Sequence, residues 1–323
     1  YFKNQKIPTD NKNYFQYIFY SEGKLFKPGK NYFKYQPNLN KRITTFYYQN
    51  NKFIKIYDYN FKTNNFGLVQ STNINPKKKS IIFLGDSFTE GIGAPPWIDK
   101  FKGDYLGYQV LNGGFQGTGF AQFKNVFEHL GKDFNLEKVV VLYIGGDLRR
   151  NILIPSNSKC LLDHSFCDRA FGAYSIPKIE SEINNFLKKK YNQRLDTKKS
   201  FKEKMRFFLR DKYIYNILRS QVNSIRLKNN KTIEMNLQSI EDLFEQKKSK
   251  IIFINLKTAE EIILKKDSYE TQLLKKFFIK KKIPNYSCDM NYDISNFHLI
   301  DFHPNEKGYN EIFLCVKKIL SDN

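Results

Sequence analysis

Residues 80–91 read Ser80-Ile81-Ile82-Phe83-Leu84-Gly85-Asp86-Ser87-Phe88-Thr89-Glu90-Gly91. The apolar run at the start of this segment has the length and composition of a buried strand. Gly85 permits a tight exit turn, and the polar residues after it stand where a helix would begin. A buried strand that passes through a glycine turn into a helix is typical of a parallel α/β sheet.

The same pattern continues along the chain. Further apolar strands are predicted at Tyr108–Leu111, Lys138–Ile144 and Lys250–Leu256. Helical spacing follows at Phe120–Leu130, with Gly131 as its stop. It returns in a C-terminal helix whose apolar face holds Ile312, Phe313, Val316, Ile319 and Leu320. Strands that alternate with helices predict a three-layer α/β/α sandwich with a mostly parallel sheet.

Two regions lie outside this alternation. Residues 1–75 are rich in Tyr, Phe, Asn and Lys, and we expect an N-terminal extension with some strand. Ile43–Tyr48 and Phe53–Tyr57 predict a hairpin within it. Residues 76–323 would form the α/β domain, with a helical insert at about 150–248.

The insert is strongly basic. Its stretch Lys188–Lys231 holds 15 Lys and Arg against 3 Asp and Glu. Apolar residues recur there at helical spacing, which indicates a helix with one face packed on the core. The alternative is a basic amphipathic helix that lies on an anionic membrane surface or polymer.

Composition limits the possible partners. Aromatic residues make up 16% of the 323, which excludes a disordered chain. No apolar run approaches the roughly 18 residues that span a bilayer. The formal net charge is +22, yet only nine of the 54 cationic residues are Arg, the usual base-reading cation. Lys is accompanied by abundant Asn, Ile, Phe and Tyr, as AT-rich codons would produce, so nucleic acid is not the expected partner.

Cysteine usage and the first residue bear on the compartment. Four cysteines are too few for a disulfide scaffold. No two of them have the CxxC spacing that would indicate a zinc site. Cys160 and Cys167 lie close in sequence, and a disulfide between them is left open, while Cys315 is expected to be a core thiol.

Because the chain starts at Tyr1, we expect a removed signal or anchor and a periplasmic or envelope-anchored protein, with a cytoplasmic location as the alternative.

Three motifs follow predicted strands, where open parallel sheets place their sites. The first is Gly85-Asp86-Ser87. Ser87 would present its hydroxyl and its own N–H at the start of the next helix, as a nucleophilic serine requires. An ordinary turn with an N-cap is the alternative reading.

The second motif is glycine-rich. It reads Asn112-Gly113-Gly114-Phe115-Gln116-Gly117-Thr118-Gly119, and the N–H of Gly117 is a candidate oxyanion donor. Its spacing matches neither the P-loop nor the dinucleotide fingerprint, so nucleotide binding is not expected.

The third motif comes just before the final helix. It reads Asp301-Phe302-His303-Pro304-Asn305-Glu306-Lys307-Gly308. His303 is a candidate base for Ser87, and Asp301 would orient the imidazole. His298 is the competing base.

Together these blocks resemble the SGNH, or GDSL, hydrolases. The order Gly-Asp-Ser-Phe-Thr-Glu-Gly, Asn-x-x-x-x-Gly, an apolar strand ending in Gly-Gly-Asp, and Asp-x-His-Pro-Asn-x-x-Gly is similar to that family, over roughly residues 65–155 and 248–320. The resemblance implies a flavodoxin-like fold with Ser87 as nucleophile, His303 as base and Asp301 as orienting acid. It also implies the N–H groups of Ser87 and Gly117 as oxyanion donors.

Two positions depart from the family pattern. Gly146 stands where the family has an Asn whose amide donates to the oxyanion. Asn112, Asn151 or the N–H of Gly146 are the candidates to replace it. The other departure is that Asp301 lies two residues before His303, where the acid is often three before it. Some envelope polysaccharide-modifying relatives share this spacing.

The resemblance implies a serine-dependent carboxylic-ester hydrolase without metal or organic cofactor. Its expected substrate is a small-molecule or polysaccharide acyl ester, such as an O-acylated carbohydrate or envelope polymer. The alternatives are a lipase-like or thioesterase-like enzyme, an O-acyltransferase, and a catalytically weak module that binds polysaccharide or a partner.

Overall fold

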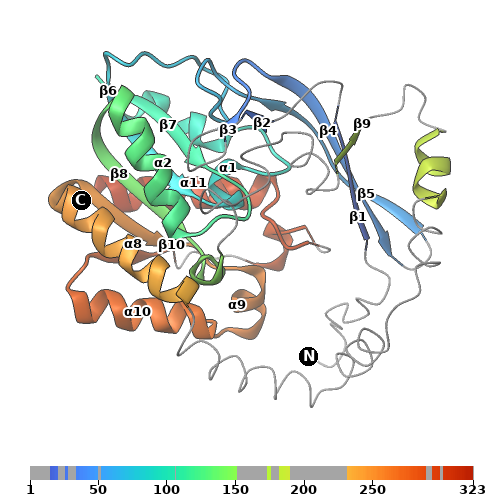
Figure 1. Cartoon of the computed structure of the whole chain (residues 1–323). Helices are drawn as coiled ribbons and strands as arrows, with labels where there is room; N and C mark the ends of the chain where they lie inside the picture. Colours follow the sequence, from blue (N-terminus) through green and yellow to red (C-terminus); the bar gives the residue numbers. More distant parts are fainter. Residues whose placement is uncertain are drawn as a thin grey trace. The chain divides into compact units, whose positions relative to one another are not determined.

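The computed structural model describes ten stretches of the chain (Figure 1). They are residues 15–20, 26–27, 34–49, 52–105, 107–150, 173–175, 182–189, 231–288, 293–298 and 301–322. The chain divides into two compact units. Among the described residues, the first unit holds 15–20, 42–49, 52–58, 173–175 and 182–189, and the second holds the remainder.

A five-stranded sheet forms the centre of the second unit. Its strand order is β11-β10-β8-β6-β7, and all four pairings are parallel. The strands are β6 (Lys79–Gly85), β7 (Gln109–Gly114), β8 (Asn135–Tyr143), β10 (Ile251–Asn255) and β11 (Asn285–Ser287). Val140 and Val141 on the central strand β8 are both essentially buried, as expected where helices cover both faces.

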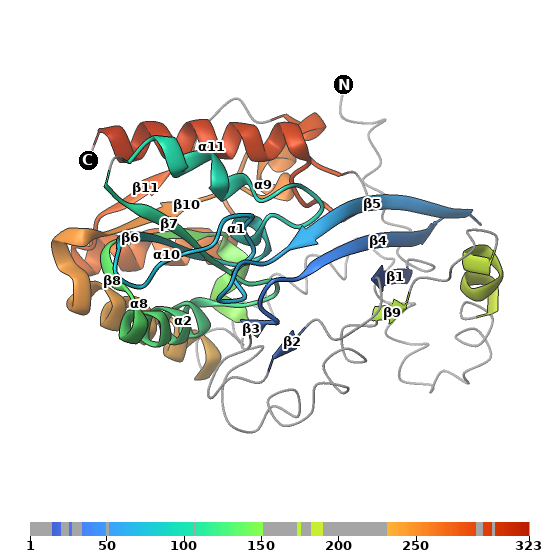
Figure 2. The same cartoon turned by 90° about the horizontal axis from the view of Figure 1, so that it is seen from above.

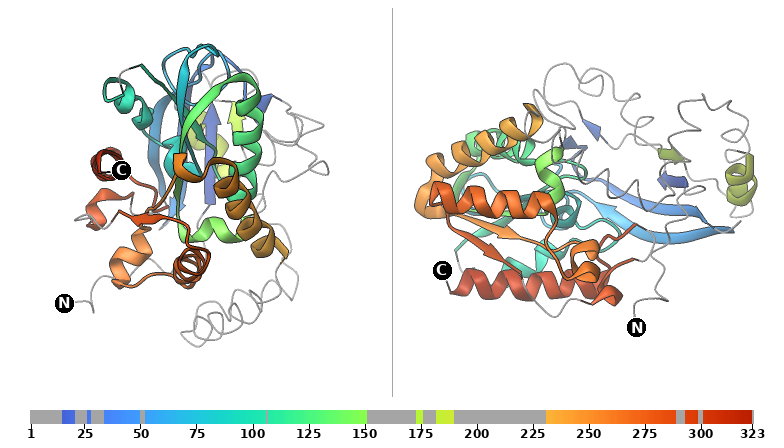
Figure 3. Two further views of the ribbon diagram at one scale, coloured as in Figure 1. Left: turned by 90° about the vertical axis from the view of Figure 1, so that its left-hand side faces the viewer. Right: turned by 90° about the horizontal axis from the view of Figure 1, so that it is seen from below.

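Helices cover the sheet on both sides (Figure 2; Figure 3, left). One face packs against α11 (Glu306–Ser321) and the 3-10 helix η2 (Trp97–Gly103). The other face packs against α2 (Phe120–Asp133), α8 (Lys231–Lys247) and α10 (Tyr269–Lys281), where Tyr143 contacts Phe120 and Phe278. Short helices complete the unit: α1 (Ser87–Glu90), η3 (Gly145–Arg149), η4 (Lys248–Lys250), α9 (Ala259–Leu264) and η5 (Ile294–Asn296). The predicted α/β/α sandwich with a parallel sheet is confirmed.

Two element boundaries differ from the prediction. Strand β7 continues through Asn112-Gly113-Gly114, which were expected in a loop, because Gly113 and Gly114 pair with Leu84 and Gly85 on β6. Helix α2 passes Gly131 and ends at Asp133. A glycine lowers helix stability by about 1 kcal/mol, which the buried face of this helix outweighs.

Cys315 is not a free core thiol. It forms a disulfide with Cys288, which joins the segment after β11 to helix α11. Its position on the apolar face was expected, but the partner lies 27 residues earlier and follows from the packing of α11.

The first unit is built on a small four-stranded sheet of order β5-β4-β1-β9. The strands are β1 (Phe15–Tyr20), β4 (Asn40–Gln49), β5 (Lys52–Lys62) and β9 (Ala173–Ser175); β4 and β5 extend into the second unit. The expected hairpin corresponds to the neighbouring strands β4 and β5. Phe46, Ile183 and Leu187 form a small core. A separate pair, β2 (Phe26–Lys27) and β3 (Lys34–Tyr35), belongs to the second unit.

Several sequence expectations fall outside the described residues. They are the Cys160–Cys167 pair, Asn151 and residues 190–230 of the basic stretch. Within the described ranges, no helix has the length and apolar composition needed to cross a membrane.

Candidate active site

Ser87 opens the short helix α1 directly after β6. Asp86 is its N-cap, since one carboxylate oxygen accepts the N–H two residues later at 2.9 Å. Asp86 and Ser87 are both buried. Gly85 is required by close packing, because a Cβ there would lie 2.0 Å from Thr89 Oγ1 and 2.5 Å from the Leu142 carbonyl oxygen on β8. The Gly-Asp-Ser sequence therefore fixes a hydroxyl at the carboxyl end of β6.

Ser87, His303 and Asp301 form a hydrogen-bonded line. Ser87 Oγ lies 3.0 Å from His303 Nε2, and His303 Nδ1 lies 3.1 Å from Asp301 Oδ2. Because a carboxylate only accepts hydrogen bonds, Nδ1 carries the proton and Nε2 offers its lone pair to the serine hydroxyl. The Asp301 side chain is 8% exposed and that of His303 is 25% exposed, so the imidazole is the more accessible of the two.

The two-residue spacing between Asp301 and His303 depends on Phe302. The φ angle of Phe302 is +60°, in the left-handed region that residues with a Cβ rarely adopt. In this turn Asp301 Oδ1 lies 3.3 Å from the backbone N of His303, while Oδ2 holds the ring. Such backbone strain costs roughly 1–3 kcal/mol and is typical of sites that need a fixed geometry.

His298 supports this turn through its backbone. Its N–H donates to the His303 carbonyl at 2.9 Å, and its carbonyl accepts the Phe302 N–H at 2.9 Å. Phe297 and Pro304 form a β-bridge beside it. The His298 imidazole is half-buried, and burial lowers its pKa. His303 makes the contact with Ser87, so His298 does not occupy the place of the base.

The expected backbone oxyanion donors are the N–H groups of Ser87 and Gly117. Within the described part of the chain, neither donates a hydrogen bond to another residue. Gly117 has a φ of +72°, which favours glycine, and it is half-buried. Backbone donors left unpaired in the fold are able to bind an oxygen of a ligand.

A buried carboxyl group ties the loop before Gly117 to helix α1. Glu90 is 2% exposed, and its Oε2 accepts the Gln116 N–H at 2.6 Å. The Tyr35 hydroxyl donates to Glu90 Oε1 at 3.0 Å. Burial raises the pKa of Glu90 to about 8. No role was predicted for Glu90, because nothing in the Gly-Asp-Ser-Phe-Thr-Glu sequence shows that its sixth residue is buried.

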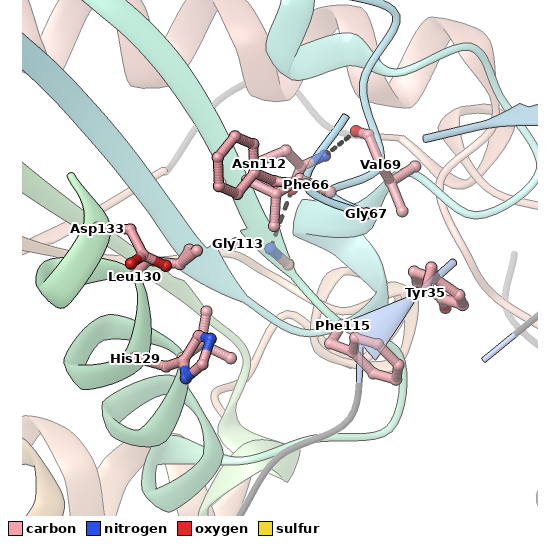
Figure 4. A pocket seen from close by; sticks show the side chains of 13 residues that line it. Tyr35, Phe66, Gly67, Val69, Asn112, Gly113, Phe115, His129, Leu130 and Asp133 are labelled. Atoms are coloured by element: carbon pink, nitrogen blue, oxygen red, sulfur yellow. Dashed lines mark hydrogen bonds between the residues drawn. The ribbon is translucent and has the colours of Figure 1, made fainter. Parts of the chain in front are cut away.

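Asn112 does not lie free for an oxyanion. Its side chain is fully buried, with Nδ2 donating to the Val69 carbonyl at 2.8 Å and Oδ1 accepting the Gly114 N–H at 3.0 Å (Figure 4). These bonds exclude Asn112 as one of the three candidates to replace the missing amide. It instead ties Val69, in the segment before β6, to strand β7.

A pocket lies beside Asn112 and is separate from the hydrogen-bonded line (Figure 4). Its walls come from β7, α2 and the segment before β6, and they include apolar Phe66 and Leu130 with polar His129 and Asp133. None of the residues Ser87, His303 and Asp301 lines it, so the pocket does not define the reacting centre.

The loop after β8 forms helix η3 and lacks a side chain at Gly146. A Cβ there would lie 3.8 Å from Ile144 Cδ1 and 4.0 Å from Arg150 Nη2, with no other described atom within 4 Å apart from the two chain neighbours and the backbone of the same helix. In the described ranges the Gly146 N–H donates to no other residue. The next residue, Asp147, is fully buried, and its Oδ2 accepts the Ile144 N–H at 3.0 Å.

Arg150 links this loop to the serine loop, although no role was predicted for it. Its Nη1 donates to Asp147 Oδ1 at 2.6 Å and also to Asp86 Oδ2. Asp86 Oδ2 lies in turn 3.3 Å from Ser87 Oγ. Burial, and then the charge of Asp86, raise the pKa of Asp147 well above its usual range, while Arg150 opposes this. Asp86 and Arg150 are 64 residues apart, and no local pattern predicts their contact.

Asn236 on α8 binds backbone carbonyls at the end of the same loop. Its side chain is fully buried, and Nδ2 donates to the carbonyls of Leu148 at 3.0 Å and Arg150 at 3.1 Å. Its Oδ1 accepts the Ala121 N–H at 2.9 Å. One amide therefore fixes the end of η3 against the start of α2.

The described residues contain no cluster of three or more His, Cys, Asp or Glu placed to hold a metal ion. The groups brought together at this site are a serine hydroxyl, an imidazole, carboxylates, a guanidinium and unpaired backbone N–H groups.

No protein-family model and no curated protein matches this chain. Among solved structures it is similar to a lipase/acylhydrolase from Enterococcus faecalis, with 12% identity over 76% of this chain and 96% of that one, at a TM-score of 0.40. It is similar to a member of the lipolytic G-D-S-L family from Veillonella parvula, with 10% identity over 76% of this chain and all of that one, at a TM-score of 0.36. A catalytic mutant of an acetylxylan esterase from Geobacillus stearothermophilus matches with 11% identity over 76% of this chain and 95% of that one, at 0.38. Likeness at this level transfers no activity or residue role, so the chemistry of the site rests on its own hydrogen bonds.

Proposed function

We propose that this protein is a serine-dependent carboxylic-ester hydrolase of the SGNH type. The observation that carries the proposal is the line from Ser87 through His303 to Asp301, with distances of 3.0 and 3.1 Å. Unpaired N–H groups at Ser87 and Gly117 support it, because acyl transfer needs donors for the oxygen that becomes charged. The four sequence blocks that resemble the SGNH hydrolases support it independently.

In the proposed reaction, Ser87 Oγ attacks the acyl carbonyl carbon and passes its proton to His303 Nε2. The carbonyl electron pair moves onto oxygen, which accepts hydrogen bonds from the backbone N–H groups. Collapse of this tetrahedral species breaks the bond to the leaving alcohol, which takes the proton from His303. Water then repeats the sequence on the acyl-enzyme and releases the acid, while Asp301 stabilises the imidazolium in both halves.

The proposed substrate is an O-acyl group on a carbohydrate or envelope polymer. Its support is the Asp301-x-His303 spacing, which resembles that of envelope polysaccharide-modifying relatives, and the His303 side chain, which is 25% exposed. If a sugar hydroxyl replaces water at the second step, the same residues perform O-acyl transfer. A location at the cell envelope, and contact of Lys188–Lys231 with an anionic membrane, stay predictions from the sequence.

The test is Ser87→Ala, with Ser321→Ala as the matched control. Ser321 ends α11 and bonds only its own helix, so its loss should leave the rate unchanged. Ser87→Ala should reduce p-nitrophenyl acetate hydrolysis to background with little change in Tm, and a fluorophosphonate should label wild type at Ser87 alone. Unchanged turnover in Ser87→Ala would exclude the serine mechanism.

The substrate class is tested with natural esters. Release of acetate from acetylated xylan, together with poor turnover of long-chain p-nitrophenyl esters, is the expected result. The reverse preference would favour the lipase-like alternative. A protein that hydrolyses no ester and takes no fluorophosphonate label would be the binding module.

A further inference from the structure

Position 146 lacks a side chain in a loop that Arg150 joins to Asp86, the residue before the proposed nucleophile. The backbone N–H groups of Ser87 and Gly117 supply two donors for an oxyanion, and the motif resemblance would place a side-chain amide at 146 as a third. Close packing does not require glycine at 146, because among the described residues beyond its chain neighbours and its own helix backbone a Cβ there would meet Ile144 Cδ1 at 3.8 Å and Arg150 Nη2 at 4.0 Å. Both are ordinary van der Waals distances, so the fold has room for a side chain.

Arg150 already lies against the space that such a side chain would enter. The Nη2 group is one of the two atoms nearest to the empty Cβ position. An Asn at 146 would therefore start in contact with the guanidinium. The cation and the missing amide would occupy neighbouring space, and both carry N–H groups that can donate to an oxyanion.

The hydrogen bonds of Arg150 leave this end of the guanidinium unused. Nη1 binds both Asp147 Oδ1 and Asp86 Oδ2, whereas Nη2 bonds no residue in the described part of the chain. The Arg150 side chain is 29% exposed, against 1% for Asp86 and 0% for Asp147. Of these three side chains, that of Arg150 is therefore the one with surface accessible to a substrate.

The cluster also holds Arg150 beside the nucleophile. Asp86 Oδ2 contacts the guanidinium and lies 3.3 Å from Ser87 Oγ. The backbone end of the residue is fixed as well, since the Arg150 carbonyl accepts from Asn236 Nδ2 at 3.1 Å. Because both its side chain and its backbone carbonyl are bonded, Arg150 should lose little conformational entropy when it binds a developing negative charge. Electrostatic catalysis depends on donors that are positioned in advance in this way.

We propose that Arg150 is a catalytic residue whose Nη2 donates to the oxyanion in place of the side chain that Gly146 lacks. This inference rests on the proposed ester hydrolysis. As Ser87 Oγ bonds to the acyl carbon, the carbonyl π pair moves onto oxygen, and that oxygen accepts the Nη2–H while the serine proton goes to His303. When the bond to the leaving group breaks, the pair returns and the contact weakens. No proton leaves the guanidinium.

The experiment compares Arg150→Lys and Arg150→Gln with Arg149→Gln in p-nitrophenyl acetate hydrolysis. Arg149 lies on the same loop but pairs with Glu270 at 2.8 Å, so it serves as the matched control and should keep the wild-type kcat. Both Arg150 variants should lose about 10²- to 10³-fold in kcat with little change in KM, the usual cost of one oxyanion donor. Lysine keeps the charge, but one ammonium is too compact to bind the carboxylates and also reach the Nη2 position.

Rescue separates catalysis from folding. Gly146→Asn added to Arg150→Gln should recover at least tenfold of the lost kcat, because the vacated space accepts the amide. In Arg150→Ala, millimolar methylguanidinium should restore turnover, whereas Ser87→Ala should not respond. Arg150 variants with kcat within threefold of wild type would overturn the inference, and so would a loss of kcat that neither rescue reverses. A wild type that neither hydrolyses esters nor takes the fluorophosphonate would instead refute the proposed function itself.

Discussion

Two loops at the carboxyl edge of the sheet differ in how the sequence motif relates to the chemistry. In the loop after β6, Ser87 stands where the Gly-Asp-Ser motif predicts it and contacts His303 at 3.0 Å. In the loop after β8, the corresponding motif position is Gly146, which has no side chain. There the Nη2 atom of Arg150, four residues later, lies 4.0 Å from the position that a Cβ would take.

The difference follows from what each loop must satisfy. The serine loop is fixed by steric demands, since a Cβ at Gly85 would lie 2.0 Å from Thr89 Oγ1. The loop after β8 leaves space at position 146, and charge fixes it instead, through Arg150 between Asp86 and Asp147. A position that is not closely packed, such as 146, can lose its usual side chain if another group, here the Arg150 guanidinium, extends into the same space.

The largest effect is expected at Asp86, the carboxylate that both loops share. Asp86→Ala removes the N-cap of α1 and leaves Arg150 with a single buried partner. Breaking a buried pair from one side typically costs about 3–5 kcal/mol. Urea titration should therefore show a fall of that size in the free energy of unfolding.

Asp104→Ala is the matched control for this change. Asp104 pairs with Lys317 at 2.6 Å in the same unit, but the two side chains are 24% and 44% exposed. A pair of this kind contributes about 1 kcal/mol or less. Equal losses in the two variants would mean that Asp86 does not join the loops more strongly than a surface pair.

The sequence predicts those site residues that lie in local motifs, but not those that act through contacts between distant segments. Local motifs were enough to single out Ser87, His303 and Asp301, and the structure brings these three into one hydrogen-bonded line. Arg150, Asn236 and Glu90 were missed, because their roles depend on contacts between distant segments. Asn112 was wrong as one of the three candidate replacements for the missing amide, since its own amide donates to the Val69 carbonyl, a contact that no local pattern predicts.

The fold was easier to predict than these contacts. Apolar strands and helical spacing predict layers directly, and the β6, β8 and β10 segments were placed within a few residues. The Cys288–Cys315 disulfide was not foreseen, because pairing depends on how α11 lies on the sheet.

A second prediction concerns the acid that each loop buries. Asp147 has a guanidinium beside it, whereas Glu90 is held by the Tyr35 hydroxyl and the Gln116 N–H, which are neutral. Burial raises the pKa of Glu90 to about 8, from an ordinary 4.5. Between these two values the unfolded chain releases a proton that the folded chain keeps, so stability falls as pH rises.

The measurement is the free energy of unfolding of wild type and Glu90→Gln from pH 5 to pH 8. Glutamine keeps an acceptor for Gln116 and cannot ionise, so the variant lacks this contribution. Wild type should lose on the order of 3 kcal/mol relative to Glu90→Gln across that range, with no further divergence above the folded pKa. Parallel profiles would show that Glu90 is already ionised in the folded protein.

The smallest effect is expected from two adjacent glycines in the loop after β8, and it tests the comparison most directly. A Cβ at Gly145 would lie 2.3 Å from Thr271 Oγ1 and 2.9 Å from the Thr271 backbone N, so Gly145→Ala should lower the free energy of unfolding by about 1–3 kcal/mol. Gly146→Ala adds the same methyl group where there is space for it. Alanine has fewer accessible backbone conformations than glycine in the unfolded chain, so this change should leave the free energy of unfolding the same or raise it by up to about 1 kcal/mol. Thermal melts of the two variants measure the difference. If Gly146→Ala is as harmful as Gly145→Ala, the backbone itself requires glycine at 146, and the bare position was not left open for Arg150.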